Sequence, residues 1–388
     1  MAATVFTRKV NGPAAHALVI GVGHYPHLPG GAAATKIANT EGMGQLASPP
    51  RSARSFARWL IERYQSPTRP LASLALLTSE KAPSAFVFRP LGKDKDVSVA
   101  PAPASMAEVE NAINDWYALG DANPDNLLLF YFCGHGIAAG LDLALLMSDF
   151  GAKPKSPLTG GAMDFRRFHA GMEECRARHQ CYFIDACQVG SDRIVRNAGF
   201  AGIPVIEWSG EKANPDGRTR LGPIFYSTMP DQKAYARAGQ ESVFTGALLE
   251  ALAGGGSGDE SGDWNVQVGL IQHALTQLMT DASERLNLPL AQVPHADLPG
   301  EVTLNTLVEP SVPVFVRVDP ADAHAVAALR CEGTVKNKRK PHPTTWHLSL
   351  PMGKYDFYAD FKANTYQADP RLNEDVRPPY WRKPLKAH

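Results

Sequence analysis

Residues 129–136 read LFYFCGHG, and residues 181–190 read CYFIDACQVG. Each stretch begins as an unbroken apolar run, which is typical of a strand buried on both faces of a parallel sheet. Each run then ends in a small cluster with a reactive side chain, His135 in the first and Cys187 in the second. Because sites in such sheets lie beyond the carboxyl ends of the strands, we expect the two clusters to share one edge of the sheet.

Apolar runs and helical patterns alternate along the chain around these two stretches. The runs that predict strands lie at 16–22, 71–77, 126–132, 180–185 and 222–228, with a hairpin arm or short strand at 143–149. Apolar residues recur at helical spacing in 51–64, 104–119, 165–178 and 243–252. Residues 88–105 are rich in proline and charge and predict a long exposed loop. This alternation predicts an α/β fold with a mainly parallel sheet sandwiched by helices.

The pattern changes after about residue 305. Residues 312–318, 344–350 and 354–361 alternate or run apolar, with turns between them and no helical period. We therefore predict two domains, an α/β domain over residues 1–305 and a small all-β, sandwich-like domain over residues 306–388.

Composition and charge argue against several classes of protein. The 388 residues include 39 Lys and Arg and 39 Asp and Glu, and this balance is not that of a dedicated nucleic-acid-binding protein. The sequence shows no apolar stretch of membrane-spanning length and no secretory signal pattern at its start. Its five cysteines are odd in number and form no CxxC pair, as in reduced intracellular proteins. We expect a cytoplasmic protein with neither nucleic-acid nor membrane partners.

A Cys and a His at neighbouring strand ends suit nucleophilic chemistry on a carbonyl. A thiol needs a base, because free cysteine is only slightly ionised at neutral pH, and the reaction needs donors for an oxyanion. The N–H of Gly136 can face a substrate because no side chain covers it, and the N–H of Cys187 is a second candidate. The alternative, a zinc site of Cys133, His135 and Cys187, lacks a fourth ligand, so we expect no metal.

GHG and DACQVG, each after an apolar strand and with 52 residues from His135 to Cys187, resemble the caspase-like clan of cysteine peptidases (peptidase C14). LVIGVG, the RSARSFARWL helix, FYSTMPDQKAYA and SVFTGALLEAL also occur in the order seen in bacterial caspase-like proteins, so the resemblance covers about residues 14–305. It implies that Cys187 is the nucleophile and His135 the general base, later the acid. The N–H groups of Gly136 and Cys187 would form the oxyanion hole.

The cysteine motif is closer to the DxCxSG pattern of metacaspases than to the caspase pattern. In metacaspases the matching acid helps to hold an Arg or Lys at the substrate position P1. The resemblance therefore implies that Asp185 gives cleavage after Arg or Lys, and it disfavours an acidic P1, which Asp185 would repel. Cys133, at the predicted pocket rim, and Asp231 are further candidate substrate-binding residues.

Two features depart from the metacaspase pattern. Ser52-Ala53 stands where the corresponding metacaspase helix opens with Asp-Ala, so a second acid at the P1 pocket is missing. Asp149 is followed by Phe150 rather than by another acid, so we expect no calcium dependence and no cofactor for the chemistry.

Residues 207–223 lie where caspases carry the linker between their large and small parts. Lys212, Arg218 and Arg220 lie in this Gly/Pro-rich stretch. If the enzyme cleaves after basic residues, it could cut itself here; the alternative is an ordinary surface loop.

The predicted C-terminal domain carries a basic run at 336–340. Lys336, Lys338, Arg339 and Lys340, with an aromatic side chain such as Trp346, could bind a phosphate-bearing ligand by charge and stacking. The alternative is that the aromatic side chains, including Tyr355, Tyr358 and Trp381, form the core of the sandwich and the lysines a solvated loop.

Regulation of the activity is suggested by the resemblance alone. Bacterial caspase-like proteins often act in antiviral defence or cell death and are switched on by a nucleotide signal or a partner. The resemblance therefore implies a regulated effector with a small-molecule second messenger as activator. The rival hypothesis is a catalytically silent scaffold of the same fold, which the presence of Cys187, His135 and Gly136 disfavours.

Overall fold

The computed structural model describes residues 3–34, 42–139, 142–155, 158–187, 189–190, 202–210, 220–229, 234, 239–259, 262–288, 292–362 and 365–388. The chain forms two compact units. Unit 1 comprises Met1–Gly246 and Gln292–Val302, and unit 2 comprises Ala247–Ala291 and Thr303–His388. This division differs from the boundary predicted after residue 305, because residues 247–291 group with the C-terminal unit.

Unit 1 is built on a sheet that has eight strands within the described residues. In spatial order these are β1 (Thr4–Thr7), β3 (Leu71–Ser79), β2 (Ala15–Val22), β7 (Leu127–Gly134), β11 (His179–Ala186), β13 (Ile224–Tyr226) and β16 (His295–Asp297), with β6 (Ala102–Pro103) also paired to β3. The inner strands run parallel, and β1 and β16 are antiparallel to their neighbours. The predicted α/β fold with a mainly parallel sheet is confirmed.

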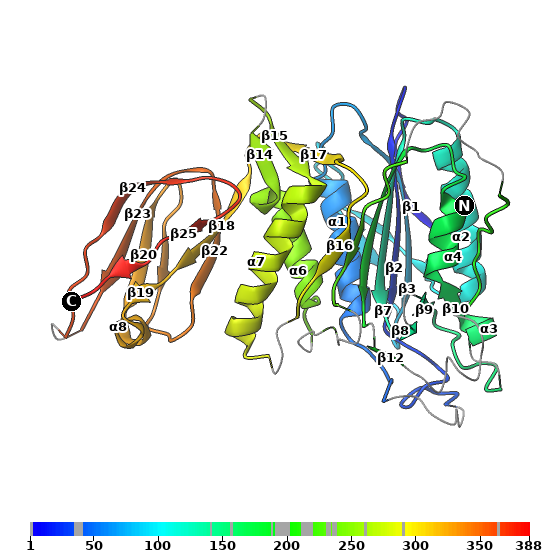
Figure 1. Cartoon of the computed structure of the whole chain (residues 1–388), viewed down its shortest axis with the longest axis horizontal. Helices are drawn as coiled ribbons and strands as arrows, with labels where there is room; N and C mark the ends of the chain where they lie inside the picture. The colour runs from blue at the N-terminus through cyan, green and yellow to red at the C-terminus, as the bar shows by residue number, and fades with distance from the viewer. Residues whose placement is uncertain are drawn as a thin grey trace. The chain divides into compact units, whose positions relative to one another are not determined.

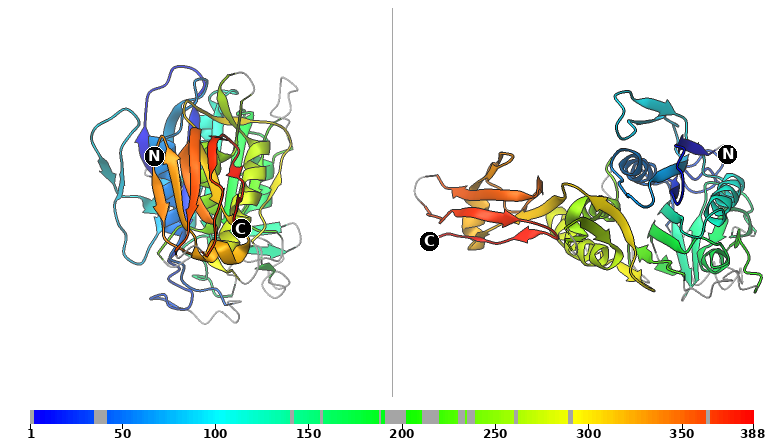
Figure 2. Two further views of the ribbon diagram at one scale, coloured as in Figure 1. Left: turned by 90° about the vertical axis from the view of Figure 1, so that its left-hand side faces the viewer. Right: turned by 90° about the horizontal axis from the view of Figure 1, so that it is seen from above.

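Helices cover both faces of this sheet (Figure 1). On one side lies α1 (Pro49–Glu62), and on the other lie α2 (Met106–Asp121) and α4 (Phe165–Met172); Figure 2 shows α1 and α2 from above. The Pro49-Pro50 pair suits the first turn of α1, where backbone N–H groups have no helical partner. Ala53, Phe56 and Leu60 then fall on the buried face, as the helical spacing predicts.

Two segments of unit 1 differ from the sequence prediction. α4 ends at Met172 rather than at 178, because the backbone N–H groups of Arg176 and Arg178 bond to Asp121 and Pro124 instead of to the preceding helical turn. The predicted loop at 88–105 instead takes part in an antiparallel hairpin of β4 (Phe86–Phe88) and β5 (Val97–Val99), with β6 following.

A second, smaller sheet of unit 1 adjoins the carboxyl ends of β7 and β11. It consists of β10 (Ala162–Asp164), β9 (Asp142–Leu146), β8 (Gly136–Ala139) and β12 (Val189–Gly190), in that order. β8 and β12, which pair in parallel, follow His135 and Cys187 closely in the chain. The backbone is therefore fixed on both sides of the two predicted catalytic residues.

Unit 2 contains the predicted β-rich region. One sheet consists of β22 (Trp346–Pro351), β18 (Ser311–Val316) and β25 (Trp381–Arg382), and the other of β21 (Asn337–Arg339), β20 (Ala328–Gly333), β23 (Gly353–Asp360) and β24 (Arg371–Val376). Side chains from both sheets, among them Val314, Leu329 and Phe357, share one apolar core. Unit 2 also holds α7 (Val268–Leu286), a helix of 19 residues that the sequence analysis did not predict.

Candidate active site

The two clusters at the ends of β7 and β11 lie at one edge of the sheet, as the sequence predicts. The two strands pair in parallel, and their last paired residues are Gly134 and Ala186. His135 and Cys187 are the next residue of each strand, so they leave the sheet side by side. Cys187 is partly exposed, and the side chain of His135 is largely buried. This arrangement offers a thiol to a substrate beside an imidazole.

The imidazole of His135 is held by a backbone carbonyl. Its Nε2 lies 2.8 Å from the carbonyl oxygen of Gly44. A carbonyl can only accept, so Nε2 carries the proton in the neutral ring and Nδ1 keeps its lone pair. Burial lowers the pKa of His135 below its ordinary value, and the bond to Gly44 acts in the opposite direction. The ring is therefore neutral at neutral pH and can take a proton at Nδ1.

Tyr25 and Gln45 hold the surroundings of His135 in place. The Tyr25 hydroxyl accepts the backbone N–H of His135 at 2.9 Å and donates to the carbonyl of Leu146 at 3.3 Å. Its ring contacts the imidazole, with ring centroids 4.9 Å apart. The Gln45 side chain accepts from the N–H of Tyr25 and donates to its carbonyl, both at 2.9 Å. This Tyr25–Gln45 clamp fixes the residue next to Gly44.

Two backbone features surround Cys187. The N–H of Ala234 donates to its sulfur at 3.2 Å, which favours the thiolate over the thiol. Gly136 lies so close that a Cβ there would be 2.5 Å from the carbonyl oxygen of Cys187 and 3.0 Å from the Cβ of Ala186. The sequence predicts an uncovered N–H at Gly136. The structure adds that any side chain here would displace the peptide that carries the thiol.

Asp185 is a buried carboxylate surrounded by neutral donors. It is 2% exposed, and one oxygen accepts from the hydroxyls of Ser242, Thr245 (2.8 Å) and Tyr131 (3.5 Å) and from the thiol of Cys133 (3.4 Å). Burial raises the pKa of Asp185, and these donors act in the opposite direction. No Arg or Lys side chain among the described residues forms a hydrogen bond or ion pair with Asp185. Within the described residues, the hydrogen-bond donors to this carboxylate are therefore neutral hydroxyl and thiol groups.

Cys133 and Ser52 complete this buried group. Cys133 is 3% exposed and lies beneath the edge of the sheet rather than at a pocket rim, and burial raises its pKa well above the ordinary value. The hydroxyl of Ser52, where metacaspases have the second acid, accepts the N–H of Ser242 at 3.0 Å and is fully buried. Asp185 is thus the one carboxylate among the residues that the structure describes in this group.

The remaining residues singled out in unit 1 have varied places. Asp231, Lys212 and Arg218 lie outside the described residues. Arg220 is partly buried, and its guanidinium donates to the carbonyl of Met172 at 3.4 Å. The carboxylate of Asp149 accepts the N–H of Met106 at 3.0 Å, at the start of α2, so it has a structural role in that turn.

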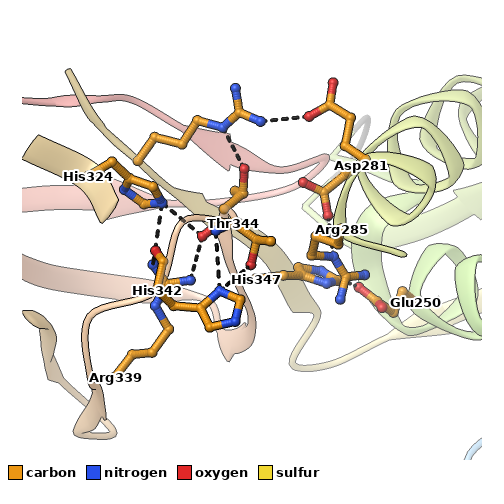
Figure 3. Close-up of polar contacts among 11 residues, drawn as sticks. Glu250, Asp281, Arg285, His324, Arg339, His342, Thr344 and His347 are labelled. Atoms are coloured by element: carbon orange, nitrogen blue, oxygen red, sulfur yellow. Dashed lines mark hydrogen bonds and ion pairs between the residues drawn. The ribbon is translucent and has the colours of Figure 1, made fainter. Parts of the chain in front are cut away.

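In unit 2 the basic run occupies β21 and its flanks. Lys336, Lys338 and Lys340 are exposed, whereas Arg339 donates to the carbonyls of Thr344 at 2.6 Å and His342 at 3.2 Å (Figure 3). The predicted stacking of Trp346 on a ligand is wrong, because Trp346 is 7% exposed and belongs to the apolar core. Tyr355 and Trp381 also belong to this core. The structure therefore matches the alternative of a core role for these aromatic residues and leaves the three lysines accessible.

Five residues of the site have functions that the sequence analysis did not assign: Tyr25, Gly44, Gln45, Ser242 and Thr245. Ser242 and Thr245 carry a signal, since Ser-x-x-Thr before an apolar run is an N-cap pattern, and the Ser242 hydroxyl does accept the N–H of Thr245 at 3.0 Å. Gly44 acts through its backbone carbonyl, and because every residue has one, the sequence gives no signal for this role.

The fold and the strand-end site define a peptidase domain of the caspase type. The family model for the caspase domain (peptidase C14) matches residues 14–295. Because this match covers well over half of the sequence, the chain belongs to the caspase family.

Two curated relatives are similar over part of their length. An uncharacterized protein, y4kE, from Sinorhizobium fredii is 28% identical over 220 residues, which are 56% of this chain and 60% of the relative. A probable protease from a Desulfuromonadales bacterium is 27% identical over 255 residues, 56% of this chain and 28% of the relative. The chain thus spans less than two thirds of the length of either relative.

Two solved structures are also similar. Protein GSU0716 from Geobacter sulfurreducens has 16% sequence identity and a TM-score of 0.42, covering 76% of this chain and 97% of the other. Caspase-1 from Spodoptera frugiperda has 13% identity and a TM-score of 0.40, covering 76% of this chain and 93% of the other. Separately, none of the helices in the described ranges has both the length and the apolar character needed to cross a membrane.

Proposed function

We propose that this chain is a cysteine endopeptidase of the caspase/metacaspase type that cleaves proteins after Arg or Lys. The observation that carries the proposal is the buried Asp185 carboxylate. It accepts hydrogen bonds from neutral groups, and no Arg or Lys among the described residues is paired with it. A buried charge of this kind is costly unless it is paired. A P1 guanidinium or ammonium group would supply the missing countercharge through charge-assisted hydrogen bonds.

In the proposed mechanism Cys187 and His135 exchange one proton. Nδ1 of His135 takes the thiol proton as the sulfur attacks the carbonyl carbon of the P1 residue. The oxyanion is stabilised by the N–H groups of Gly136 and Cys187. His135 then returns the proton to the departing amine, leaving a thioester. Water, deprotonated by His135, hydrolyses the thioester and restores the thiol. No cofactor takes part in these steps.

Peptide cleavage tests this directly. Purified protein and the Cys187→Ala variant are incubated with fluorogenic peptides that end in Arg, Lys, Asp or Ala, with and without calcium and a panel of nucleotides. We expect cleavage after Arg and Lys only, lost in Cys187→Ala and retained in Cys331→Ala, a matched control because Cys331 is a buried free thiol of unit 2.

The same experiment has outcomes that contradict the proposal. Cleavage after Asp or Ala alone would overturn the role of Asp185. No cleavage under any condition, together with no labelling of Cys187 by an arginyl chloromethylketone, would instead favour the catalytically silent scaffold.

Regulation is the second part of the proposal. A cytoplasmic protease with basic specificity needs a switch, and we assign this role to a small nucleotide signal or a partner, in an antiviral defence or cell-death response. Self-cleavage at Lys212, Arg218 or Arg220 would be one consequence of basic specificity, and mass spectrometry of the active enzyme after prolonged turnover tests it. An active protein that stays one intact chain would exclude processing as the switch.

The exposed lysines of β21 are the candidate anion contacts in unit 2. The variant with Lys336, Lys338 and Lys340 changed to Ser should lose activation by a nucleotide that activates the original protein, while keeping its basal activity. An unchanged response would remove these lysines from the proposal.

A further inference from the structure

A separate cavity lies at the carboxyl ends of β2 and β3. Its volume is about 530 Å³, and His135, Cys187 and Asp185 are not among its lining residues. Three segments form its walls: the residues after β2, the residues that lead into and begin α1, and the residues after β3. Because β2 and β3 run parallel to β7 and β11, the cavity opens along the same edge of the sheet as the Cys187–His135 pair.

The cavity has a surplus of positive charge. Its lining includes the cations Arg51, Arg54 and Lys81 and the single carboxylate Glu80. Glu80 is already engaged: it accepts from Arg54 at 2.5 and 3.4 Å and from the N–H and hydroxyl of Ser84 at 3.2 and 3.3 Å. Arg54 and Glu80 therefore neutralise each other.

The surplus charge belongs to Arg51 and Lys81. Both side chains are exposed, and neither forms an ion pair with any residue that the structure describes. They come from different walls, Arg51 from the first turn of α1 and Lys81 from the segment after β3. Two cations facing a cavity from separate elements suit the recognition of an anion.

Backbone hydrogen bonds join the segments that form the walls of the cavity. The N–H groups of Gly23 and His24 both donate to the carbonyl of Ser79 at 3.0 Å, and the N–H of Leu46 donates to the carbonyl of Gly23 at 2.8 Å. The cavity is therefore formed before any ligand arrives, as is usual for binding sites.

One wall is continuous with the candidate catalytic machinery. Gln45 and Leu46 line the cavity directly after Gly44, whose carbonyl holds His135. Arg51 directly precedes Ser52, which lies in the buried group around Asp185. A peptide that places its P1 side chain toward Asp185 and its scissile bond at Cys187 thus passes close to these walls.

We propose that this cavity is a second substrate subsite, which binds an Asp or Glu side chain of the peptide whose Arg or Lys occupies P1. The proposal rests on the proposed function and adds a second element to its specificity. Arg51 would offer its planar donor fork to the carboxylate, and Lys81 a point charge. Because both cations are exposed, we expect a preference of only about fivefold to tenfold.

Paired peptides test the subsite. Each peptide has Arg at P1 and either Glu or Gln at one position, and the position is moved along both sides of the scissile bond. We expect one position where Glu raises kcat/KM over Gln by about fivefold to tenfold, mainly through KM. In the double variant Arg51→Glu with Lys81→Glu, the preference at that position should reverse in favour of Lys.

Lys9→Glu is the matched control for these variants. Lys9 is an exposed cation of unit 1 that does not line the cavity, so its reversal should leave the Glu preference intact. A Glu/Gln ratio within twofold at every position would overturn the subsite while leaving the proposed function standing, as would a preference that survives the double reversal.

A binding measurement separates the subsite from catalysis. In the Cys187→Ala background, fluorescence anisotropy compares the Glu and Gln peptides with and without millimolar inorganic phosphate. We expect tighter binding of the Glu peptide, with phosphate competing more strongly against it than against the Gln peptide. If phosphate binds at Arg51 and Lys81 but Glu gives no advantage, the cavity serves a free anion, and the substrate subsite is overturned. This outcome does not depend on whether the protein cleaves peptides.

Discussion

Two buried carboxylates, Asp185 in unit 1 and Asp281 in unit 2, have opposite surroundings. In unit 1 the Asp185 carboxylate is 2% exposed and receives only hydroxyl and thiol donors among the described residues. In unit 2 the Asp281 carboxylate is 3% exposed and lies 2.7 Å from the guanidinium of Arg285, and the partly exposed Glu250 lies 2.8 Å from His347 (Figure 3). The first carboxylate has no cationic partner among the described residues, and the second has one.

Whether a buried charge has a partner of opposite charge helps to distinguish functional from structural polar groups, even where no sequence motif marks them. A paired charge stabilises the fold and is costly to break, because its partner is then left alone. An unpaired buried charge works against the fold and persists where function requires it. On this basis the largest consequences of substitution for activity should fall in unit 1, and those for stability in unit 2.

The largest predicted effect is that of Asp185→Asn. Loss of the buried charge should lower kcat/KM for Arg and Lys peptides by about a hundredfold or more, because the P1 cation loses its partner. The same variant should not lower the melting temperature at pH 7. Since the folded-state pKa of Asp185 is raised, its stabilising contribution is complete below the unfolded value and is lost as the pH rises through the folded value. Asn removes that pH-dependent loss.

The comparison itself is tested by Glu250→Gln in unit 2. This substitution keeps the shape and removes the carboxylate that lies 2.8 Å from His347, so it should destabilise the fold by about 1 kcal/mol and leave peptide cleavage unchanged. Denaturant unfolding of both variants at pH 7 measures the contrast. If Asp185→Asn proved the more destabilising of the two, the distinction between the units would be wrong.

The next effect concerns the Tyr25–Gln45 clamp. Gln45→Ala removes both bonds to the backbone of Tyr25 and frees the segment that carries the Gly44 carbonyl, so we expect kcat to fall about tenfold with KM little changed. Tyr25→Phe keeps the ring against His135 and loses only the hydroxyl, and its loss should be smaller. Gln367→Ala, an exposed glutamine of unit 2, is the control. A KM effect without a kcat effect would argue against positioning of His135.

Features that depend on local sequence patterns could be predicted, whereas those that depend on contacts between residues far apart in the chain could not. The positions of His135, Cys187 and the main strands along the chain could be predicted because the two residues follow apolar runs and the strands consist of them, and such runs are local patterns. The Gly44 carbonyl and the Tyr25 hydroxyl reach His135 across 91 and 110 residues of chain, and nothing in their own surroundings marks them. Likewise, only tertiary contacts decided that Trp346 lies in a core rather than on a surface.

A third effect is the pH dependence of the Cys187–His135 pair. Burial lowers the pKa of His135, so the neutral imidazole should persist below the ordinary histidine value of 6.5. The rate of Cys187 alkylation by iodoacetamide should therefore fall on the acid side with a midpoint below pH 6.5. Alkylation is chosen because peptide cleavage, in the proposed mechanism, also requires Asp185 to be ionised. A midpoint above 6.5 would show that the thiolate, rather than burial, sets the protonation of His135.

The smallest effect belongs to His324, which tests whether unit 2 also contains a pH-sensitive position. Its Nδ1 accepts the N–H of Val318 at 3.1 Å, and its Nε2 donates to the carbonyl of Thr344 at 2.8 Å, so the ring fits only when neutral. Burial lowers the pKa of His324, and the nearby cations Arg339 and Arg317 add to this, while the Thr344 carbonyl opposes it.

A lowered folded-state pKa gives stability that is present above the unfolded value and is lost as the pH falls through the folded value. The free energy of unfolding of unit 2 should therefore decrease between pH 7.5 and 5. His324→Gln should reduce that slope and cost about 1 kcal/mol at pH 7.5 through poorer hydrogen bonds. His388→Gln, at the exposed C-terminus, should change neither. If the free energy of unfolding depended on pH equally in the original protein and in His324→Gln, the acid sensitivity would arise from another group. Of Asp185 and His324, only Asp185 would then remain as a buried group whose charge is predicted to change the stability of the fold.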